Sequence, residues 1–426
     1  MLNDPVPPGV PRPDGLVLAP FRALRYDAAH VDVGAVVAPP YDVIDDAERD
    51  ALEARDPHNV VRLTLPRGGD ERYATAAATL AAWRLDGSLA ADATAAVYVY
   101  EQQAAGHVQR GLVGALGLSP AEDGIVLPHE NTMSGTVADR LALTAATEAD
   151  LEMIMLVYDG DGPASQVVAT ADREPPIADV SDPGGVRHRV WAITDPATLS
   201  EVAADLHDRR AVIADGHHRY ATFLAYQAQR HADGAGTGPW DLGLAFLVDG
   251  SAFGPQVHAI HRAVPSLSAA EAVERARSGF TVTALPGVDD ASDALATAGK
   301  QGTAFVISDG EQAWLLTDPD RQAVEAALPA DRSAAWRALD VAVAHGYLIS
   351  ELWGLDDNEQ VVEFHHDVES ALNSARSTGG VALLLNPTPV ADVAAVAAEG
   401  DRMPRKSTLF VPKPATGLLM RAFADA

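Results

Sequence analysis

The sequence contains no cysteine, and this absence excludes several kinds of chemistry at once. Without thiols there are no disulfides, no cysteine nucleophile, no thiolate metal site and no cysteine redox cycle. Lysine is also scarce, because arginine carries the positive charge everywhere except at Lys300, Lys406 and Lys413. A lysine ammonium is a compact, flexible point charge, whereas arginine presents a planar fork. The two lysines within "MPRKSTLFVPKPATG" therefore suggest that a compact, flexible positive charge has a function at these positions. Chance is the competing explanation.

Long apolar runs are missing as well. No uninterrupted run reaches the roughly 18 residues of a membrane span, and the opening "MLNDPVPPGVPRPDG" lacks the basic start and apolar stretch of a secretion signal. We therefore expect a soluble, cytoplasmic protein with no membrane partner. Basic residues are outnumbered 31 to 60, which leaves a formal net charge of −29. Such a chain repels phosphate backbones, so we expect no nucleic-acid partner and only local binding of any phosphate.

The length of the chain predicts more than one domain. At 426 residues, 47% of them apolar, it exceeds the size at which a single core usually keeps growing. Helix-like and strand-like segments alternate, which predicts an α/β or α+β fold with mixed sheets. We expect a flexible arm over residues 1–15, an N-terminal α+β domain over 16–110, a central domain over 111–265 and a C-terminal α+β domain over 266–426.

Apolar spacing predicts the principal elements. It places helices at residues 71–83, 136–149 and 196–209 and from residue 217, and a strand at 153–158. Two hairpins are expected, one from the runs around "AAGH" and one over "GTAFVISDGEQAWLLTD". Two extended runs are also expected around the Asp-Gly turn in "LGLAFLVDGSAFGPQVHAIHRAV".

The stretch "AVIADGHHRYATFLAYQAQR" places an apolar strand before an Asp-Gly break and an amphipathic helix after it. Asp215 to Arg219 therefore lie at a strand-to-helix corner. The first N–H groups of a helix have no internal partners, and the helix dipole favours an anion by about 0.3–1 kcal/mol. Gly216 lets a ligand approach the backbone, and Arg219 can grip a phosphate with two hydrogen bonds. Asp215 can hold a Mg²⁺ ion on that phosphate.

A purely structural explanation of this corner competes with the functional one. Asp215 can serve as a helix cap and Gly216 as a turn, with His217 and His218 in a solvated first turn. A cap and a turn need neither two histidines nor an arginine, and this excess favours an anion-binding corner. A zinc site is disfavoured, because adjacent side chains on a helix point about 100° apart.

A second polar segment, "LPHENTMSGTVADR", contains His129 and Glu130 between an apolar run and a helix. A carboxylate at this place can act as general base toward an alcohol, which is typically worth about 10²–10⁴ in rate. The structural alternative makes Glu130 a surface carboxylate and Asp139 and Arg140 ordinary helix charges. Weaker candidates are Tyr41 and Asp42 in "APPYDVIDDAE" and the group His258, His261 and Arg262 in "HAIHRAV".

Common nucleotide-binding and hydrolase signatures are absent. The sequence has no G-x-x-x-x-G-K-[ST], no G-x-G-x-x-G after a strand, no G-x-S-x-G and no H-E-x-x-H. Several segments instead resemble the domain of unknown function 1015 family from about residue 16 to residue 419: "APFRALRY", "VVAPPYDVI", "PHENT", "IADGHHRYAT", "LLLNPTPV" and "RMPRKSTLFVPKPATGL". That family name implies no established activity.

The "DGHHR" corner is also similar to the phosphate-binding corner of the ParB/sulfiredoxin superfamily, most of all to its free-serine kinase branch. The resemblance implies a ParB/sulfiredoxin-like core over residues 111–265, flanked by α+β segments. It implies Glu130 as base, with His129 beside it, and Asp215 as metal ligand. It further implies phosphate or nucleotide contacts at Gly216, His217, His218 and Arg219. Additional candidates for such contacts, outside the resemblance, are Arg140, Lys406, Lys413, His261 and Arg262.

The composition narrows the activities of that superfamily. Sulfiredoxin chemistry requires a cysteine, and a ParB-like role on DNA conflicts with the net charge of −29. Phosphoryl transfer remains, and it depends mainly on positioning and charge neutralisation. We therefore expect a Mg²⁺-dependent phosphotransferase acting on a small hydroxyl-bearing metabolite such as L-serine, with ATP, ADP or pyrophosphate as donor. The alternatives are a small-molecule phosphatase, for instance of phosphoserine, and a nucleotide-binding regulatory or scaffold protein. No oligomeric state is indicated.

Overall fold

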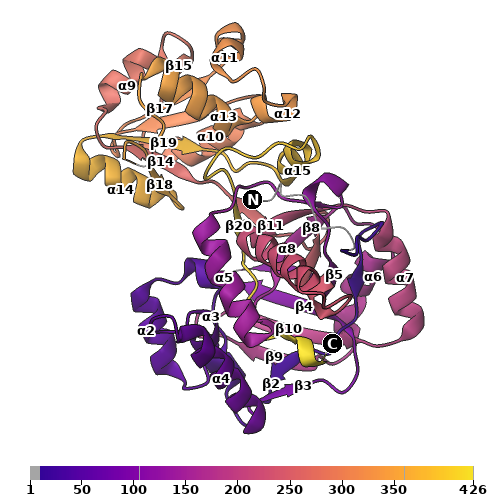
Figure 1. The fold of residues 1–426 in the computed structure, drawn as a ribbon. Helices are drawn as coiled ribbons and strands as arrows, with labels where there is room; N and C mark the ends of the chain where they lie inside the picture. Colours follow the sequence, from indigo (N-terminus) through magenta and orange to yellow (C-terminus); the bar gives the residue numbers. More distant parts are fainter. Residues whose placement is uncertain (1–9, 105, 359, 426) are drawn as a thin grey trace. The chain divides into compact units, whose positions relative to one another are not determined.

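The computed structural model describes residues 10–425 except 105 and 359, and these form two compact units (Figure 1). Unit 1 contains the described residues up to Pro255 and those from Pro412 onward, whereas unit 2 is Gln256–Val411. The chain thus leaves unit 1 once and returns to it near its end. Unit 2 begins close to the predicted boundary at residue 265. Most of the predicted arm, residues 1–9, lies outside the described residues.

The predicted boundary at residue 110 falls within a strand rather than between domains. Strands β4 (Val97–Ala104) and β5 (His107–Gly117) form the antiparallel hairpin expected around "AAGH". The hairpin joins residues 16–110 and 111–255 in one sheet, and its strands pair with others on both sides. The sequence shows the hairpin but not these further partners, which are distant along the chain.

The sheet of unit 1 is mixed, and this confirms the predicted fold class. Its strand order is β6-β11-β8-β12-β5-β4-β10-β9, with β1 paired to β5. Strand β11 runs parallel to β6, and β12 runs parallel to β8, while the other pairs are antiparallel. The remaining strands are β1 (Leu18–Ala19), β6 (Val126–Leu127), β8 (Ile154–Tyr158), β9 (Ala178–Ser181), β10 (Arg187–Ile193), β11 (Ala211–Asp215) and β12 (Leu242–Asp249).

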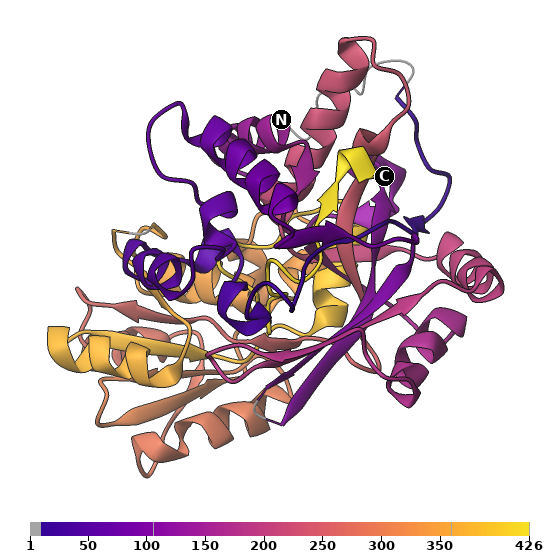
Figure 2. The same cartoon turned by 90° about the horizontal axis from the view of Figure 1, so that it is seen from below.

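The predicted helices of unit 1 are confirmed to within two residues at their ends. They correspond to α4 (Arg72–Leu85), α5 (Ser134–Thr147), α7 (Pro196–His207) and α8 (His217–Ala232). Helices α5 and α8 pack on each other, as do α6 (Pro163–Thr170) and α7. The pair α5 and α8 is separated from the pair α6 and α7 along the sheet (Figure 2). The shorter helices α1 (Val33–Val36), α2 (Asp46–Arg55) and α3 (Val61–Thr64) precede α4.

The C-terminal segment is held in unit 1 by backbone pairing. Thr416 forms a bridge with Ala38, and strand β21 (Arg421–Ala422) pairs with β7 (Ala149–Asp150). Arg421 and Asp150 form an ion pair of 2.7 Å whose side chains are both buried. Met420 belongs to the hydrophobic core formed with α2 to α5 and with β2 (Leu24–Tyr26) and β3 (Leu89–Ala91). These contacts hold the segment that begins just before Lys413 in unit 1.

Unit 2 contains an antiparallel six-stranded sheet of order β15-β17-β16-β19-β14-β18. The predicted hairpin is confirmed as β16 (Phe305–Ser308) and β17 (Ala313–Thr317). The other strands are β13 (Gln256–His258), β14 (His261–Val264), β15 (Thr281–Ala284), β18 (Glu363–His365), β19 (Val381–Leu385) and β20 (Leu409–Val411). Its helices are α9 (Ala269–Ala276), α10 (Ala291–Gly299), α11 (Arg321–Ala327), α12 (Ala334–Arg337), α13 (Asp340–Ala342), a π-helix (Val343–Leu352), α14 (Val368–Thr378) and α15 (Val390–Ala398).

Both extended runs expected around the Asp-Gly turn are present, but they do not pair with each other. Strand β12 ends at Asp249 and belongs to the sheet of unit 1, whereas β13 pairs with β20 and β14 with β18 and β19 in unit 2. The turn therefore joins two units, not two paired strands. In the part of the chain that the structure describes, no helix is long and apolar enough to cross a membrane.

Candidate functional site

The two sequence motifs that carry the candidate chemistry meet at the start of α8. The N–H of His129 donates to Nε2 of His217 over 3.2 Å, and the N–H of Met133 donates to Nε2 of His218 over 3.0 Å. The rings of His129 and His217 stand edge to face, with centroids 4.5 Å apart. The "PHENTM" loop is therefore bound directly to the "DGHHR" corner, although about 85 residues separate them along the chain.

The corner depends on glycine at position 216. This residue has φ 95° and ψ 31°, a left-handed conformation that L-residues with side chains disfavour. A Cβ atom here would lie 2.8 Å from Cγ2 of Ile154. The first hydrogen bond of the helix runs from the N–H of Tyr220 to the carbonyl of Gly216. The sharp turn therefore places the first amides of α8, which have no partners within the helix, directly after the end of β11.

The two corner histidines act as acceptors for the loop. Because Nε2 of each receives a backbone N–H, the ring proton of each lies on Nδ1. In His217 this Nδ1 faces Oε2 of Glu130 at 3.7 Å. Burial lowers the pKa of His218, and Arg219 adds to this effect while Asp42 opposes it. The histidines thus position the loop through Nε2, a role that the sequence did not indicate, and their expected contact with phosphate stays a prediction.

Asp215 lies at the centre of a buried ion cluster. Its Oδ1 is 2.6 Å from Nζ of Lys413, and its Oδ2 is 2.5 Å from a terminal nitrogen of Arg219. The Lys413 ammonium also lies 3.1 Å from Asp42. Burial alone would raise the pKa of Asp215, but Arg219 and Lys413 outweigh it and hold the pKa below its ordinary value. Two carboxylates and two cations therefore balance one another at this corner.

The arrangement does not suit Asp215 as a magnesium ligand. Both of its oxygens already contact cations, and Mg²⁺ would have to approach the positive charges of Arg219 and Lys413. Among the described residues, no group of three or more histidine, aspartate or glutamate side chains could hold a metal ion. Asp215 instead serves as the counter-ion that keeps two cations at the corner.

Sequence reasoning missed Glu152, which lies behind the corner. Burial raises the pKa of Glu152, while Arg219 and Arg140 oppose the rise. Its Oε1 accepts a 2.9 Å hydrogen bond from the N–H of Tyr41, and the Tyr41 ring lies 4.4 Å from the guanidinium carbon of Arg140 and 6.0 Å from that of Arg219. No motif surrounds Glu152 in the sequence. The Pro-Pro turn before Tyr41 was the only signal for this part of the site.

Arg140, a candidate phosphate contact, is largely engaged within unit 1. It donates to the carbonyl of Thr64 over 2.6 Å and to Oδ2 of Asp139 over 2.9 Å through Nε. It therefore borders the corner through Tyr41 rather than entering the Asp215 cluster.

Three other candidate contacts, His261, Arg262 and Lys406, belong to unit 2. His261 Nδ1 accepts from the N–H of Leu385, and burial, aided by Arg262, lowers the pKa of His261 to about 4. Arg262 donates to His345 Nε2 and to the Lys406 carbonyl, over 2.8 and 2.9 Å. These residues stabilise unit 2, and their expected contact with a phosphate remains a prediction.

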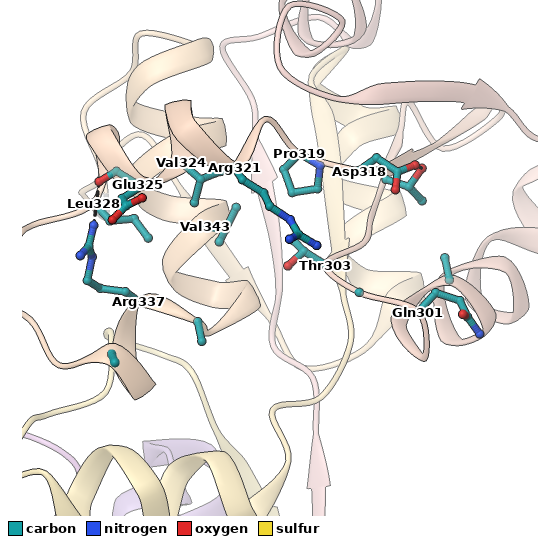
Figure 3. A pocket seen from close by; sticks show the side chains of 15 residues that line it. Gln301, Thr303, Asp318, Pro319, Arg321, Val324, Glu325, Leu328, Arg337 and Val343 are labelled. Carbon is teal, nitrogen blue, oxygen red and sulfur yellow. Dashed lines mark hydrogen bonds between the residues drawn. The ribbon is translucent and has the colours of Figure 1, made fainter.

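Unit 2 also contains a cavity of about 820 Å³ that no sequence motif marked. Figure 3 shows Arg321 extending toward Thr303, with Glu325 and Arg337 elsewhere on the wall. None of the candidate residues from the sequence lines this cavity. Its walls combine these polar groups with Val324, Leu328 and Val343, a mixture typical of small-molecule pockets.

Fold and site together define a two-unit mixed α/β protein with a charged strand-to-helix corner. A family described as "Protein of unknown function (DUF1015)" matches residues 18–342, so the chain belongs to this family, as the sequence motifs predicted. No curated protein matches the sequence.

Several solved structures are similar to part of the chain. A free serine kinase variant in complex with ADP is 14% identical, covers 67% of this chain and 84% of its own, and has a TM-score of 0.32. A free serine kinase in complex with AMP is 14% identical, covers 67% of this chain and 83% of its own, and has a TM-score of 0.30. SbnI with C-terminal truncation from Staphylococcus aureus is 11% identical, covers 70% of this chain and 82% of its own, and has a TM-score of 0.34. At these scores the similarities assign no activity to this chain.

Proposed function

We propose that unit 1 transfers a phosphoryl group from a phosphate donor to the hydroxyl of a small metabolite. One observation carries the proposal: the Glu130 carboxylate, 45% exposed, stands 3.7 Å from His217 at the start of α8, beside the buried Asp215 cluster. A base that substrate can reach thus lies next to a helix start that can bind an anion.

The division of roles follows from the geometry. Glu130 accepts the proton of the acceptor hydroxyl while that oxygen forms a bond to the transferred phosphorus, and the bond to the leaving oxygen of the donor breaks. The first amides of α8 bind the phosphate oxygens. Lys413, whose side chain is 20% exposed, donates from the rim of the cluster to the same oxygens. Arg219 is held by Asp215 and by the carbonyl of Met153, so it contributes fixed positive charge.

The donor and the acceptor are the finer part of the proposal. ATP, ADP and pyrophosphate are the donors to compare, and any Mg²⁺ belongs to the metal–phosphate substrate, because Asp215 does not suit a protein-held ion. L-serine is the first acceptor to test because of the "PHE" and "DGHHR" motifs. The positive charges of Arg219 and Lys413 serve the positioning and charge neutralisation on which phosphoryl transfer depends.

The decisive test compares Glu130→Gln with a matched control, Glu201→Gln, on an exposed face of α7. Wild-type protein is incubated with serine and other hydroxyl acceptors against each donor, and products are followed by mass spectrometry and ³¹P NMR. We expect Glu130→Gln to slow transfer by about 10²–10⁴ with donor binding retained, and Glu201→Gln to behave as wild type. Normal transfer by Glu130→Gln would refute the role of Glu130.

Phosphate transfer to water is a second candidate function, favoured by the exposure of Glu130. A base that is 45% exposed is open to water, whereas kinases exclude water from the reacting phosphate. Incubation with phosphoserine in the presence and absence of ADP separates the two reactions. Phosphate release without ADP supports a phosphatase. Saturable nucleotide binding with no product from any combination supports a regulatory protein without turnover.

A further inference from the structure

A second cavity in unit 1, of about 540 Å³, collects an unusual number of cations. Four arginines line it, namely Arg49, Arg67, Arg72 and Arg140, together with one carboxylate, Asp139. The whole chain has 60 acidic residues and only 31 basic ones, so a wall of this composition runs against the charge of the protein. A local excess of guanidinium groups around a cavity is the composition expected of an anion site.

The four arginines reach the cavity from separate elements. Arg49 lies on α2, Arg67 in the loop after α3, Arg72 at the start of α4 and Arg140 on α5. An exposed helix face would place such charges on one element at helical spacing. Here the fold brings Arg140 to one cavity with Arg49, Arg67 and Arg72, which lie on consecutive elements of the N-terminal part of unit 1. The loop contains Gly68, whose φ of 114° is disfavoured for residues with side chains, so this part of the wall stays free of a side chain.

Carboxylates behind the cavity orient the arginines without using all of their donors. Glu53 accepts from Nε of Arg67 over 2.8 Å and lies 3.5 Å from Nε of Arg49. Asp139 accepts from Arg72 over 2.8 Å and from Arg140 over 2.5 Å. Asp50 also ion-pairs with Arg67, so three carboxylates face four guanidinium groups, and each guanidinium has five N–H donors.

Arg49 gives the clearest sign that the arginines around the cavity have hydrogen-bond donors without acceptors. Within the described residues its Nη2 is buried and donates no hydrogen bond, and its side chain is only 17% exposed. Burying an unsatisfied charged donor costs stability, so such a group usually has a partner in the functional state. An anion in the cavity would supply the missing acceptor.

We propose that this cavity binds the phosphate group of a small-molecule anion. Guanidinium groups pair with phosphate through two parallel hydrogen bonds, and four of them can surround a doubly charged phosphate. The volume exceeds that of a phosphate ion alone and is in the range of small-ligand pockets. This inference does not rest on phosphoryl transfer at the α8 corner, because none of its arguments uses Glu130, Asp215 or Lys413.

The cavity also borders that corner. The guanidinium of Arg140 lies on the Tyr41 ring, which in turn lies near the guanidinium of Arg219. A bound phosphate would compete with Asp139 for Arg140 and so alter a contact at the edge of the corner. The cavity is therefore placed to sense a phosphorylated ligand beside the candidate active site.

The test uses the full chain with inorganic phosphate and pyrophosphate as probes and malonate as a carboxylate comparison. Arg67→Gln and Arg72→Gln remove one guanidinium each, and their side chains are 51% and 32% exposed, so both variants should fold. Arg55→Gln, on the exposed end of α2 outside the cavity, is the matched control for charge. Thermal unfolding verifies folding of each variant.

Hydrogen exchange locates the bound anion and calorimetry measures its affinity. We expect a phosphate probe to slow amide exchange in residues 62–75, and each cavity variant to weaken binding by about tenfold or more, with Arg55→Gln unchanged. Three results would overturn the proposal: no protection of residues 62–75, protection confined to residues 211–224 at the α8 corner, or equal affinity in wild type and both variants. Malonate binding as tight as that of phosphate would contradict the assignment to phosphate.

Discussion

Replacing Lys413 by methionine should destabilise the corner by about 3 kcal/mol. The change keeps an unbranched chain as far as the ε position and removes the ammonium that lies 2.6 Å from Asp215 and 3.1 Å from Asp42. Removing one partner of a buried ion pair costs about 3–5 kcal/mol, because the other charge stays buried. Lys413 is 20% exposed and Asp215 keeps Arg219, so we expect the lower end of that range.

The same interaction predicts a pH dependence in the alkaline range. Burial alone would lower the pKa of Lys413, but Asp215 and Asp42 outweigh it and raise the pKa above its ordinary value. A raised lysine pKa contributes stability that is fully present below the unfolded pKa of about 10.4 and is lost as the pH rises through the folded value. Wild-type protein should therefore lose stability above about pH 10 through this group, and Lys413→Met should lose none of it.

Hydrogen exchange in residues 211–224 is the appropriate assay, because a two-unit protein need not unfold in a single step. Lys300→Met is the matched control, since Lys300 lies at the exposed end of α10 in unit 2. It should leave exchange in 211–224 unchanged. A loss below about 1 kcal/mol in Lys413→Met, or an alkaline profile identical to that of wild type, would show that Lys413 is not an essential member of the cluster.

Two further substitutions test other parts of the structure. Gly216→Ala should lower the free energy of unfolding by about 2 kcal/mol or more, because it adds left-handed strain and a Cβ 2.8 Å from Ile154. The control, Gly234→Ala, adds the same kind of strain (φ 78°) but has open space around the new Cβ. Equal losses of stability in urea unfolding of the two variants would rule out the contact with Ile154 as a cause. Burial raises the pKa of Asp340 to about 6, so the stability of unit 2 should fall by about 2 kcal/mol as the pH rises from 4 through 6. Asp340→Asn should remove this loss of stability. A dependence of stability on pH in Asp340→Asn identical to that of wild type would refute the prediction.

Local features of the fold were predictable because their causes are local. The helix from residue 217 follows from its apolar spacing, and the hairpin β4–β5 joins strands that are neighbours along the chain. The return of the C-terminal segment to unit 1 and the partners of the distant strands were not predictable in this way. They depend on pairings such as Thr416 with Ala38 and β14 with β19, whose members are far apart in sequence and carry no mutual signal.

The candidate site shows the same contrast. Glu130 and Asp215 stood out because polar residues follow apolar strands, and the structure brings their segments together. Lys413 stood out by the rarity of lysine, and it joins them because the C-terminal segment returns to unit 1. Glu152 gave no signal, since a single acidic residue before a strand is ordinary until its burial among arginines is known.

Net charge misleads about anions in this protein because it averages over the whole surface. At −29 the chain should repel phosphate at long range, but this repulsion is screened within about 10 Å at 0.1 M salt. At shorter range the charged side chains next to an anion decide whether it is bound. The α8 corner pairs two carboxylates with two cations, and the cavity beyond Arg140 sets four guanidinium groups against three carboxylates, Asp50, Glu53 and Asp139. A small anion could therefore be bound within one such neighbourhood even though the net charge of the whole chain is strongly negative.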